Sequence, residues 1–281
     1  MAMTLISPQA LLPRIDDDDC VVVDCRFDLA DPDAGRAAWL AGHIPGAHCA
    51  HLDDDLAGPV GDSGGRHPLP DLAAFEQRLA DWGIREDSLV VAYDDAGGAI
   101  AGRLWWLLRD CGHERVALLD GGFRAWQAAG LPVETHTPET GAAPVRQLVT
   151  GQMPTLDAAA VARVLRDGAM VLIDVRAPAR FAGAEEPLDK QAGHVPGALN
   201  LPLTGNVDAD GRFLSRAALG QRFRELLGGR APADAVIMCG SGVSACQTLL
   251  AMEHAGLPGA SLYTGSWSDW ISDPARPIAR L

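Results

Sequence analysis

The sequence predicts an α/β protein of two similar domains, each a parallel β-sheet with helices on both faces. Three observations lead to this prediction. Segments of the first half recur in the second half at offsets near 150 residues. Apolar runs typical of strands alternate with helical patterns. A stretch rich in Pro, Thr and Gly without hydrophobic periodicity separates the two halves. The chain of 281 residues is long enough for two domains.

The internal repeat consists of four segment pairs in the same order. They are VVVDCR (21–26) with VLIDVR (171–176), AGHIPGAH (41–48) with AGHVPGAL (192–199), LVVAYDDAGG (89–98) with AVIMCGSG (235–242), and LLDGGFRAW (118–126) with LYTGSWSDW (262–270). A period this long indicates two compact domains rather than a solenoid. We therefore predict one domain over 1–132, a linker over 133–153 and a second domain over 154–281.

The second half shows the alternation of strands and helices most clearly. We predict helices over 156–168, 215–228 and 243–256, and strands over 170–175, 235–238 and 260–263. Strands that alternate with helices form a parallel sheet, and such sheets bind ligands just beyond the carboxyl ends of their strands. Cys239 directly follows the strand over 235–238. The residue at the equivalent place in the first half is Asp94.

Composition excludes several classes of protein. The content of 48% hydrophobic and 21% charged residues is typical of an ordinary globular chain, and no apolar run is long enough to cross a bilayer. A net charge of −14 argues against nucleic-acid and anionic-membrane partners. The first 20 residues lack the features of a secretion signal, so we expect a cytoplasmic protein. The six cysteines show no zinc-binding spacing, and we expect free thiols, no metal and no cofactor.

Cys239 is the candidate nucleophile. The two glycines of the following GSGVS segment let successive N–H groups turn toward one point, and the next helix directs the positive end of its dipole there. Such a loop stabilises a thiolate and equally a persulfide anion. A substrate bound at this loop is expected to contact Gly240, Gly242, Val243 and Ser244. The alternative is that Cys239 is a small buried apolar residue.

The loop CGSGVSA (239–245) resembles the active-site loop of the 3-mercaptopyruvate sulfurtransferases, within the tandem-domain rhodanese superfamily. The resemblance also covers the Asp-x-Arg strand ends and the G-H-[I/V]-P-G-A segments. It implies two rhodanese domains with the cysteine only in the second, so that the first domain, with Asp94, forms no persulfide. The implied reaction moves sulfur from 3-mercaptopyruvate or a similar small donor, through a Cys239 persulfide, to cyanide or to a thiol such as thioredoxin or a low-molecular-weight thiol.

The resemblance also implies roles for individual residues. Arg180 matches the arginine that binds the donor carboxylate. The second arginine of the family falls at Leu188, in EEPLDK, and Lys190 is the candidate to replace its charge. A relay of the family corresponds to Asp53, His67 and Ser241.

Several groups repeat in the half that lacks the cysteine, and we interpret them as structural. They are Asp24, Arg26 and His43 in the first half and Asp174, Arg176 and His194 in the second. We expect Trp267 and Trp270 to flank a turn, as core or pocket wall. The first-half loop DDAGGAI (94–100) is expected not to direct its N–H groups at one point.

Two further functions remain open at this stage, a thiosulfate sulfurtransferase and a persulfide carrier without catalysis. A cysteine phosphatase on the same fold needs an arginine six positions after the cysteine. Because Ala245 stands there, the sequence largely excludes that class.

Overall fold

The computed structural model describes residues 3–61, 65–138 and 143–281. Contacts within the chain divide it into two compact units. Unit 1 comprises Met1–Gly58, Pro70–Gln152 and Val207–Phe213, and unit 2 comprises Pro59–Leu69, Met153–Asn206 and Leu214–Leu281. Each unit therefore includes a short segment from the other half of the chain. The domain and linker limits expected from the sequence stay a prediction.

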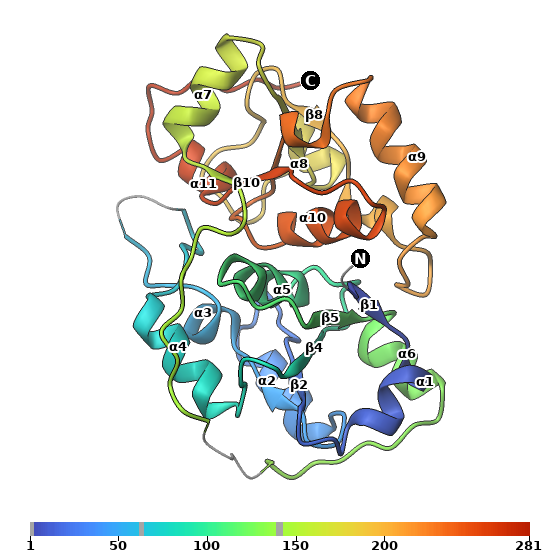
Figure 1. Cartoon of the computed structure of the whole chain (residues 1–281). Coiled ribbons are helices and arrows are strands. Elements are labelled where there is room, and N and C mark those ends of the chain that lie inside the picture. The colour runs from blue at the N-terminus through green and yellow to red at the C-terminus, as the bar shows by residue number, and fades with distance from the viewer. Residues whose placement is uncertain (1–2, 62–64, 139–142) are drawn as a thin grey trace. The chain divides into compact units, whose positions relative to one another are not determined.

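Unit 1 contains a sheet of five parallel strands in the order β1-β5-β4-β2-β3 (Figure 1). The strands are β1 (Leu5–Ile6), β2 (Cys20–Asp24), β3 (His48–Cys49), β4 (Leu89–Tyr93) and β5 (Val116–Leu119). The helices are α1 (Pro8–Leu11), α2 (Ala34–Ala41), α3 (Leu52–Asp55), α4 (Leu72–Asp81), α5 (Ala101–Asp110) and α6 (Gly122–Ala128).

Unit 2 repeats this topology with the strand order β6-β10-β9-β7-β8, again all parallel. The strands are β6 (Thr155–Leu156), β7 (Val171–Asp174), β8 (Leu199–Asn200), β9 (Ala235–Met238) and β10 (Ser261–Tyr263). The helices are α7 (Ala158–Arg166), α8 (Pro178–Ala182), α9 (Arg216–Leu227), α10 (Ala245–His254) and α11 (Ser266–Trp270). The predicted fold is confirmed. Trp267 and Trp270 are buried in the core of unit 2, as expected, but they lie on α11 instead of flanking a turn.

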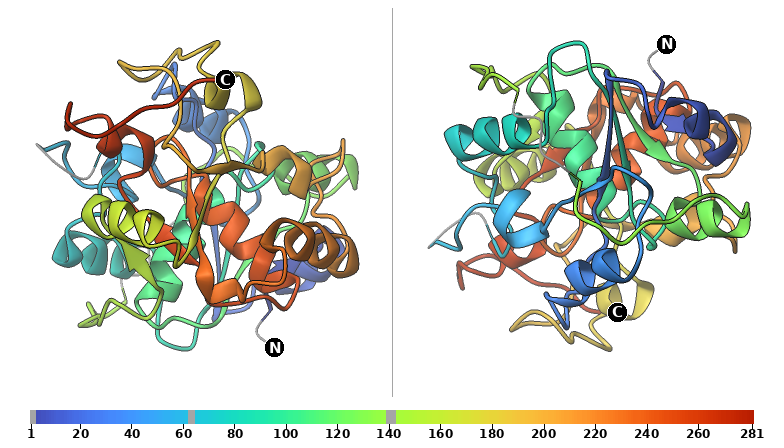
Figure 2. Two further views of the ribbon diagram at one scale, coloured as in Figure 1. Left: turned by 90° about the horizontal axis from the view of Figure 1, so that it is seen from above. Right: turned by 90° about the horizontal axis from the view of Figure 1, so that it is seen from below.

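The two faces of each sheet are buried by alternate residues of the strands. In unit 1, Leu89, Val91 and Tyr93 of β4 pack with Leu11 of α1 and Trp126 of α6, two helices that can be followed in Figures 1 and 2. The intervening residues of β4 are buried on the opposite face. Strands buried on both faces read as continuous apolar runs, which explains why the sequence identified them. Within the described part of the chain, no helix is long and apolar enough to cross a membrane.

A buried ion pair follows the second strand of each sheet. Arg26 Nη2 lies 2.6 Å from Asp24 Oδ2 and donates to the Gly42 carbonyl at 2.8 Å. In unit 2, Arg176 Nη2 lies 2.7 Å from Asp174 Oδ2 and donates to the Gly193 carbonyl. These four charged side chains are buried, which agrees with their interpretation as structural residues.

The repeated histidines are also buried. The Nδ1 atom of His43 lies 2.7 Å from the Trp39 carbonyl oxygen, and that of His194 lies 2.8 Å from the Phe181 carbonyl oxygen. Each imidazole ring stacks on the ring of its partner residue. Both histidines therefore contribute to the packing of their units.

The loop after β4 binds the Asp94 carboxylate with four backbone N–H groups. Those of Ala96 and Gly98 donate to Oδ1, and those of Ile100 and Ala101 donate to Oδ2, at 2.8–2.9 Å. The expectation that this loop does not direct its N–H groups at one point is therefore wrong. The first repeat forms an anion nest, and its own side chain fills it.

Replacing Asp94 by Ala is expected to destabilise the protein by about 3 kcal/mol or more, because it leaves buried N–H donors without an acceptor. Chemical denaturation measures this loss. The neighbouring, exposed Asp95 is the matched control, and Asp95→Ala should change the free energy of unfolding by only about 0.5 kcal/mol. Equal effects of the two variants would contradict a structural role of the nest.

Candidate active site around Cys239

Cys239 directly follows β9 at the carboxyl end of the sheet, and it is buried. Its N–H donates to Ser266 Oγ at 3.1 Å, and its carbonyl accepts from the N–H of Trp267 at 3.1 Å. The next carbonyl, that of Gly240, accepts from the N–H of Ser268 at 2.9 Å. The first turn of α11 therefore fixes the backbone on both sides of the sulfur-bearing residue.

Ser266 adopts an unfavourable backbone conformation at this contact. Its φ of +52° is the one positive value of a non-glycine residue in the described part of the chain. Gly122 occupies the equivalent position in unit 1, with φ +58°. The left-handed region costs a non-glycine residue about 1–2 kcal/mol. What the serine adds is its Oγ, which accepts from Cys239 and donates to the Tyr263 carbonyl at 2.9 Å.

Gly242 is required by the path of the loop into α10. Its φ is +80°, and a Cβ atom at this position would lie 2.0 Å from the carbonyl oxygen of Thr264. No L-residue with a side chain fits there without movement of the backbone. The close approach sets the turn that leads from Cys239 to the N-terminus of α10.

Two of the three residues expected to form a relay contact each other within unit 2. His67 Nδ1 lies 2.6 Å from Ser241 Oγ, and both side chains are buried. His67 belongs to unit 2, although it precedes α4 in the sequence. Asp53, the third residue, lies on α3 in unit 1 and is exposed.

Arg180 belongs to a chain of alternating charges. Its Nε and Nη2 bind Glu186, with Nη2 to Oε1 at 2.6 Å, and Nη2 also reaches Asp189 Oδ2 at 3.2 Å. Glu186 Oε2 lies 3.3 Å from Nη1 of the buried Arg176. Asp189 in turn binds Arg66, with Nε to Oδ1 at 2.8 Å. The chain therefore runs from the ion pair after β7 to two partly exposed guanidinium groups.

Leu188 and Lys190 line a pocket of about 430 Å³ in unit 2. Arg66, Asp189 and Ser268 line it as well. Leu188, where the resemblance implies an arginine, thus lines a pocket that is also lined by a different arginine, Arg66. Sequence reasoning missed Arg66, although it directly precedes His67 in GRHPLP.

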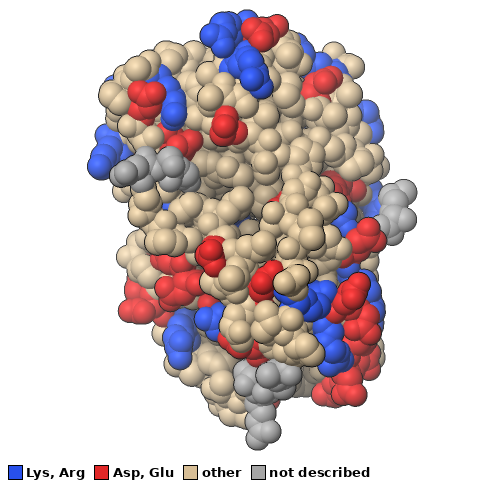
Figure 3. All heavy atoms as spheres, turned by 60° about the vertical axis from the view of Figure 1, so that its left-hand side comes forward, with Lys and Arg blue, Asp and Glu red and all other residues tan. Residues whose placement is uncertain are grey.

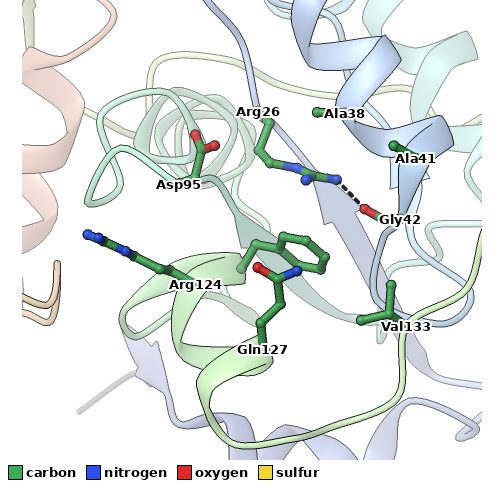
Figure 4. Close-up of a pocket in the computed structure, with 9 residues that line it drawn as sticks. Arg26, Ala38, Ala41, Gly42, Asp95, Arg124, Gln127 and Val133 are labelled. Carbon is green, nitrogen blue, oxygen red and sulfur yellow. Dashed lines mark hydrogen bonds between the residues drawn. The ribbon is translucent and has the colours of Figure 1, made fainter.

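The corresponding corner of unit 1 is built differently. A pocket of about 480 Å³ lies beside Arg26, with Asp95, Arg124 and Gln127 on its wall (Figure 4). Figure 4 shows the Arg26 guanidinium directed at the Gly42 carbonyl. It also pairs with Asp24, and its Cζ lies 4.2 Å from the ring centre of Phe123 and 6.0 Å from that of Tyr93. The extended chain of charges is thus a feature of unit 2.

Four thiols of unit 1 are poor nucleophiles. Burial raises the pKa of Cys20, Cys49 and Cys111 to about 11, and it raises that of the fully buried Cys25 well above its ordinary value. Because the thiolate is the reactive form, these thiols are largely unreactive at neutral pH. Among the described residues, no group of three or more His, Cys, Asp or Glu side chains could hold a metal ion.

Comparison with known proteins gives consistent matches over nearly the whole chain. The Rhodanese-like domain family matches residues 7–129 and 157–273. A probable 3-mercaptopyruvate sulfurtransferase of Pseudomonas aeruginosa is 46% identical over 98% of this chain and 97% of its own length. A putative thiosulfate sulfurtransferase, SseB, of Mycobacterium tuberculosis is 41% identical over 94% and 92%. The structure of 3-mercaptopyruvate sulfurtransferase from Leishmania major superimposes with a TM-score of 0.84 at 30% identity, covering 98% of this chain and 75% of that one.

Replacing Gly242 by Ala is expected to destabilise unit 2 and to displace the loop, because the added Cβ would overlap the Thr264 carbonyl. The matched control is Gly197→Ala, since Gly197 has φ +84° but no atom within 4 Å of the added Cβ. In the control, the free energy of unfolding should fall only by the cost of a left-handed backbone for a non-glycine residue, about 1–2 kcal/mol. Denaturation of both variants measures the difference, and equal losses would contradict the steric argument.

Proposed function

Because the chain belongs to the rhodanese family, we propose that it moves sulfur from 3-mercaptopyruvate, through a persulfide on Cys239, to a thiol or cyanide acceptor. In the first step the Cys239 thiolate attacks the sulfur of the donor. The carbon–sulfur bond breaks, its electron pair stays on carbon, and the thiol proton of the donor ends on that carbon. The products are pyruvate and a cysteine persulfide anion, which the acceptor then cleaves.

The place of Cys239 is the observation that carries this proposal. Cys239 follows β9, the strand of unit 2 that corresponds to β4 of unit 1. In the loop after β4, four backbone N–H groups bind the Asp94 carboxylate. A loop of the same origin, before the N-terminus of α10, suits a thiolate or a persulfide anion. We assign contacts with the donor sulfur to the loop residues Gly240, Gly242, Val243 and Ser244.

Ser241 and His67 are suited to the proton transfer. Their hydrogen bond of 2.6 Å places an exchangeable proton two residues from Cys239. A group that protonates the enolate as it forms lowers the barrier to carbon–sulfur cleavage. We propose that Asp53 completes this relay.

Arg180 is the proposed carboxylate-binding residue. Glu186 holds one edge of its planar fork, which leaves the guanidinium oriented before a donor arrives. Glu186 and Asp189 take its Nε and Nη2, so we assign the charge-assisted contact with the donor carboxylate to Nη1. Lys190, in the neighbouring pocket, stays a predicted contact.

Thiosulfate is the second candidate donor, and Leu188 in place of the arginine of the family favours it. Against it stands the loop CGSGVS, which contains no basic residue to meet a dianion. The comparisons include relatives with either name. Steady-state kinetics with both donors decides between them, and repeated release of pyruvate distinguishes an enzyme from a stoichiometric persulfide carrier.

Thioredoxin or a low-molecular-weight thiol is the proposed acceptor, and the cytoplasm is the proposed location. Lys and Arg side chains on the face shown in Figure 3 are interspersed with Asp and Glu rather than joined in one basic surface. Such a surface gives no support for a nucleic-acid partner.

Replacing Cys239 by Ser is expected to abolish sulfur transfer and to leave the fold intact, because the hydroxyl is nearly isosteric but a far poorer nucleophile. Pyruvate release and intact-mass measurement after donor treatment provide the test, and wild-type protein should gain one sulfur atom on Cys239. Cys246→Ser, a change at the other buried cysteine of this region, is the control and should retain the added sulfur. Sulfur on another cysteine, or activity of Cys239→Ser, would contradict the assignment.

Replacing Arg180 by Ala is expected to lower kcat/KM for 3-mercaptopyruvate by about 10- to 150-fold, the loss of a charge-assisted contact of about 1.5–3 kcal/mol. Arg180→Lys should recover only part, because a point charge does not reproduce the fork. With thiosulfate the loss should be smaller. Equal losses for both donors would show that Arg180 does not recognise the carboxylate.

A further inference from the structure

We propose that Arg66 is the second arginine of the donor site, and that Arg66 and Arg180 together bind a monoanionic carboxylate beside Cys239. This inference rests on the proposed sulfur transfer and identifies what selects its donor. It assigns to Arg66, in the segment before α4, the charge that the resemblance leads one to expect at Leu188.

Both guanidinium groups converge on the residue after the cysteine. A Cβ atom added to Gly240 would lie 3.0 Å from Arg66 Nη2 and 3.6 Å and 3.7 Å from Nη2 and Nη1 of Arg180. The two forks therefore meet over one peptide of the loop, next to the proposed nucleophile. We therefore place the carboxylate of a donor that reacts at Cys239 between these two groups.

The backbone of Arg66 is tied to the same loop. Its N–H donates to Ser268 Oγ at 3.0 Å, and the N–H of Ser268 donates to the Gly240 carbonyl at 2.9 Å. The preceding residue, Gly65, has φ +75°, and a Cβ there would lie 2.4 Å from Ser268 Oγ. This close approach fixes Arg66 at the site independently of its side chain.

Asp189 positions both side chains. It binds Nε and Nη2 of Arg66 and Nη2 of Arg180, and its own side chain is 2% exposed. Within the described part of the chain, Nη1 of either arginine donates to no acceptor. Asp189 thus occupies the Nε/Nη2 edge of Arg66 and shares Nη2 of Arg180 with Glu186, which leaves the Nη1 group of each arginine for a bound anion.

The charge balance of the cluster selects the class of donor. Three carboxylates, Asp174, Glu186 and Asp189, are matched by three arginines, Arg176, Arg180 and Arg66. The cluster carries no net charge, and a dianion is repelled by the Cys239 thiolate more strongly than a monoanion is, so the unpaired donors suit one negative charge better than two. A small 2-oxo carboxylate fits this site better than thiosulfate.

Lys190 is the alternative source of the second charge. It is exposed, and it forms no hydrogen bond or ion pair with the residues that the structure describes. A flexible ammonium group loses side-chain entropy when it is fixed on a ligand. Arg66 is held in place by Asp189 before any ligand binds, and for this reason we assign the role to it.

Titration of the full-length Cys239→Ser protein with pyruvate tests the proposal, because it measures carboxylate binding without turnover. Arg66→Ala in this background should weaken the affinity for pyruvate about 10- to 150-fold, the range of one charge-assisted contact. Arg66→Lys keeps a charge beside Asp189. It should therefore keep the denaturation midpoint while recovering only part of the affinity.

Arg276→Ala is the matched control. Arg276 lies in unit 2 with its side chain 26% exposed, close to the 28% of Arg66. It pairs with Asp273 and donates to the carbonyls of Asp269 and Trp270, at the end of α11 and not at the loop residues 239–244. The affinity for pyruvate of this variant should stay within about twofold of its parent. An Arg66→Ala variant that also stays within twofold would overturn the proposal. A larger loss for Lys190→Ala than for Arg66→Ala would do so as well, as would the absence of pyruvate binding to the parent.

Turnover of the wild-type protein is measured separately and tests the proposed function alone. No sulfur transfer from either donor would reject that function. Pyruvate binding that depends on Arg66 would still establish the carboxylate site. Conversely, rapid turnover with an affinity for pyruvate indifferent to Arg66 would leave the function standing and remove this residue from it.

Discussion

A buried carboxylate–guanidinium pair closes the second strand of each repeat, and the rest of each unit is arranged around it. Charges this deeply buried are tolerated only when every hydrogen-bonding group has a partner. In unit 2, Arg176 satisfies this requirement with Asp174, the Gly193 carbonyl and Glu186, while its guanidinium lies 4.6 Å from the ring centre of Trp267. The pair thereby fixes the end of β7, the segment before His194 and the start of α11 relative to one another.

The candidate site is an extension of this constraint. Glu186 pairs with Arg176 and orients Arg180. Asp189 pairs with Arg180 and orients Arg66 in the same way. Long side chains that would otherwise sample many rotamers are in this way oriented before a ligand binds. Unit 1 contains the equivalent pair of Asp24 and Arg26. There Arg26 contacts the Gly42 carbonyl and the Phe123 ring in place of a second carboxylate.

The sequence predicted those features that depend on local pattern. Continuous apolar runs located the strands after which Asp94 and Cys239 stand, and the internal repeat aligned the two halves. Local sequence pattern did not predict contacts between residues distant in the chain. Arg66 meets Asp189 across 123 positions, and no periodicity or spacing encodes that pairing. The nest around Asp94 was missed for a different reason, because hydrogen bonds from successive peptides depend on backbone torsions that the letters DDAGGAI do not specify.

The assignment of short segments to the opposite unit has a consequence for the order in which the protein folds during synthesis. Unit 1 includes Val207–Phe213, where the N–H of Phe213 donates to Asp120 Oδ1, so its last piece leaves the ribosome after much of unit 2. Pro59–Leu69, in contrast, is synthesised early, and it can pack only after the other residues of unit 2, from Met153 onward, have been made. The two halves of the duplicated gene product are thus no longer self-sufficient. A nascent chain that stops at the linker has completed neither unit, and the first unit is complete only when Met153–Asn206 of the second has also been made.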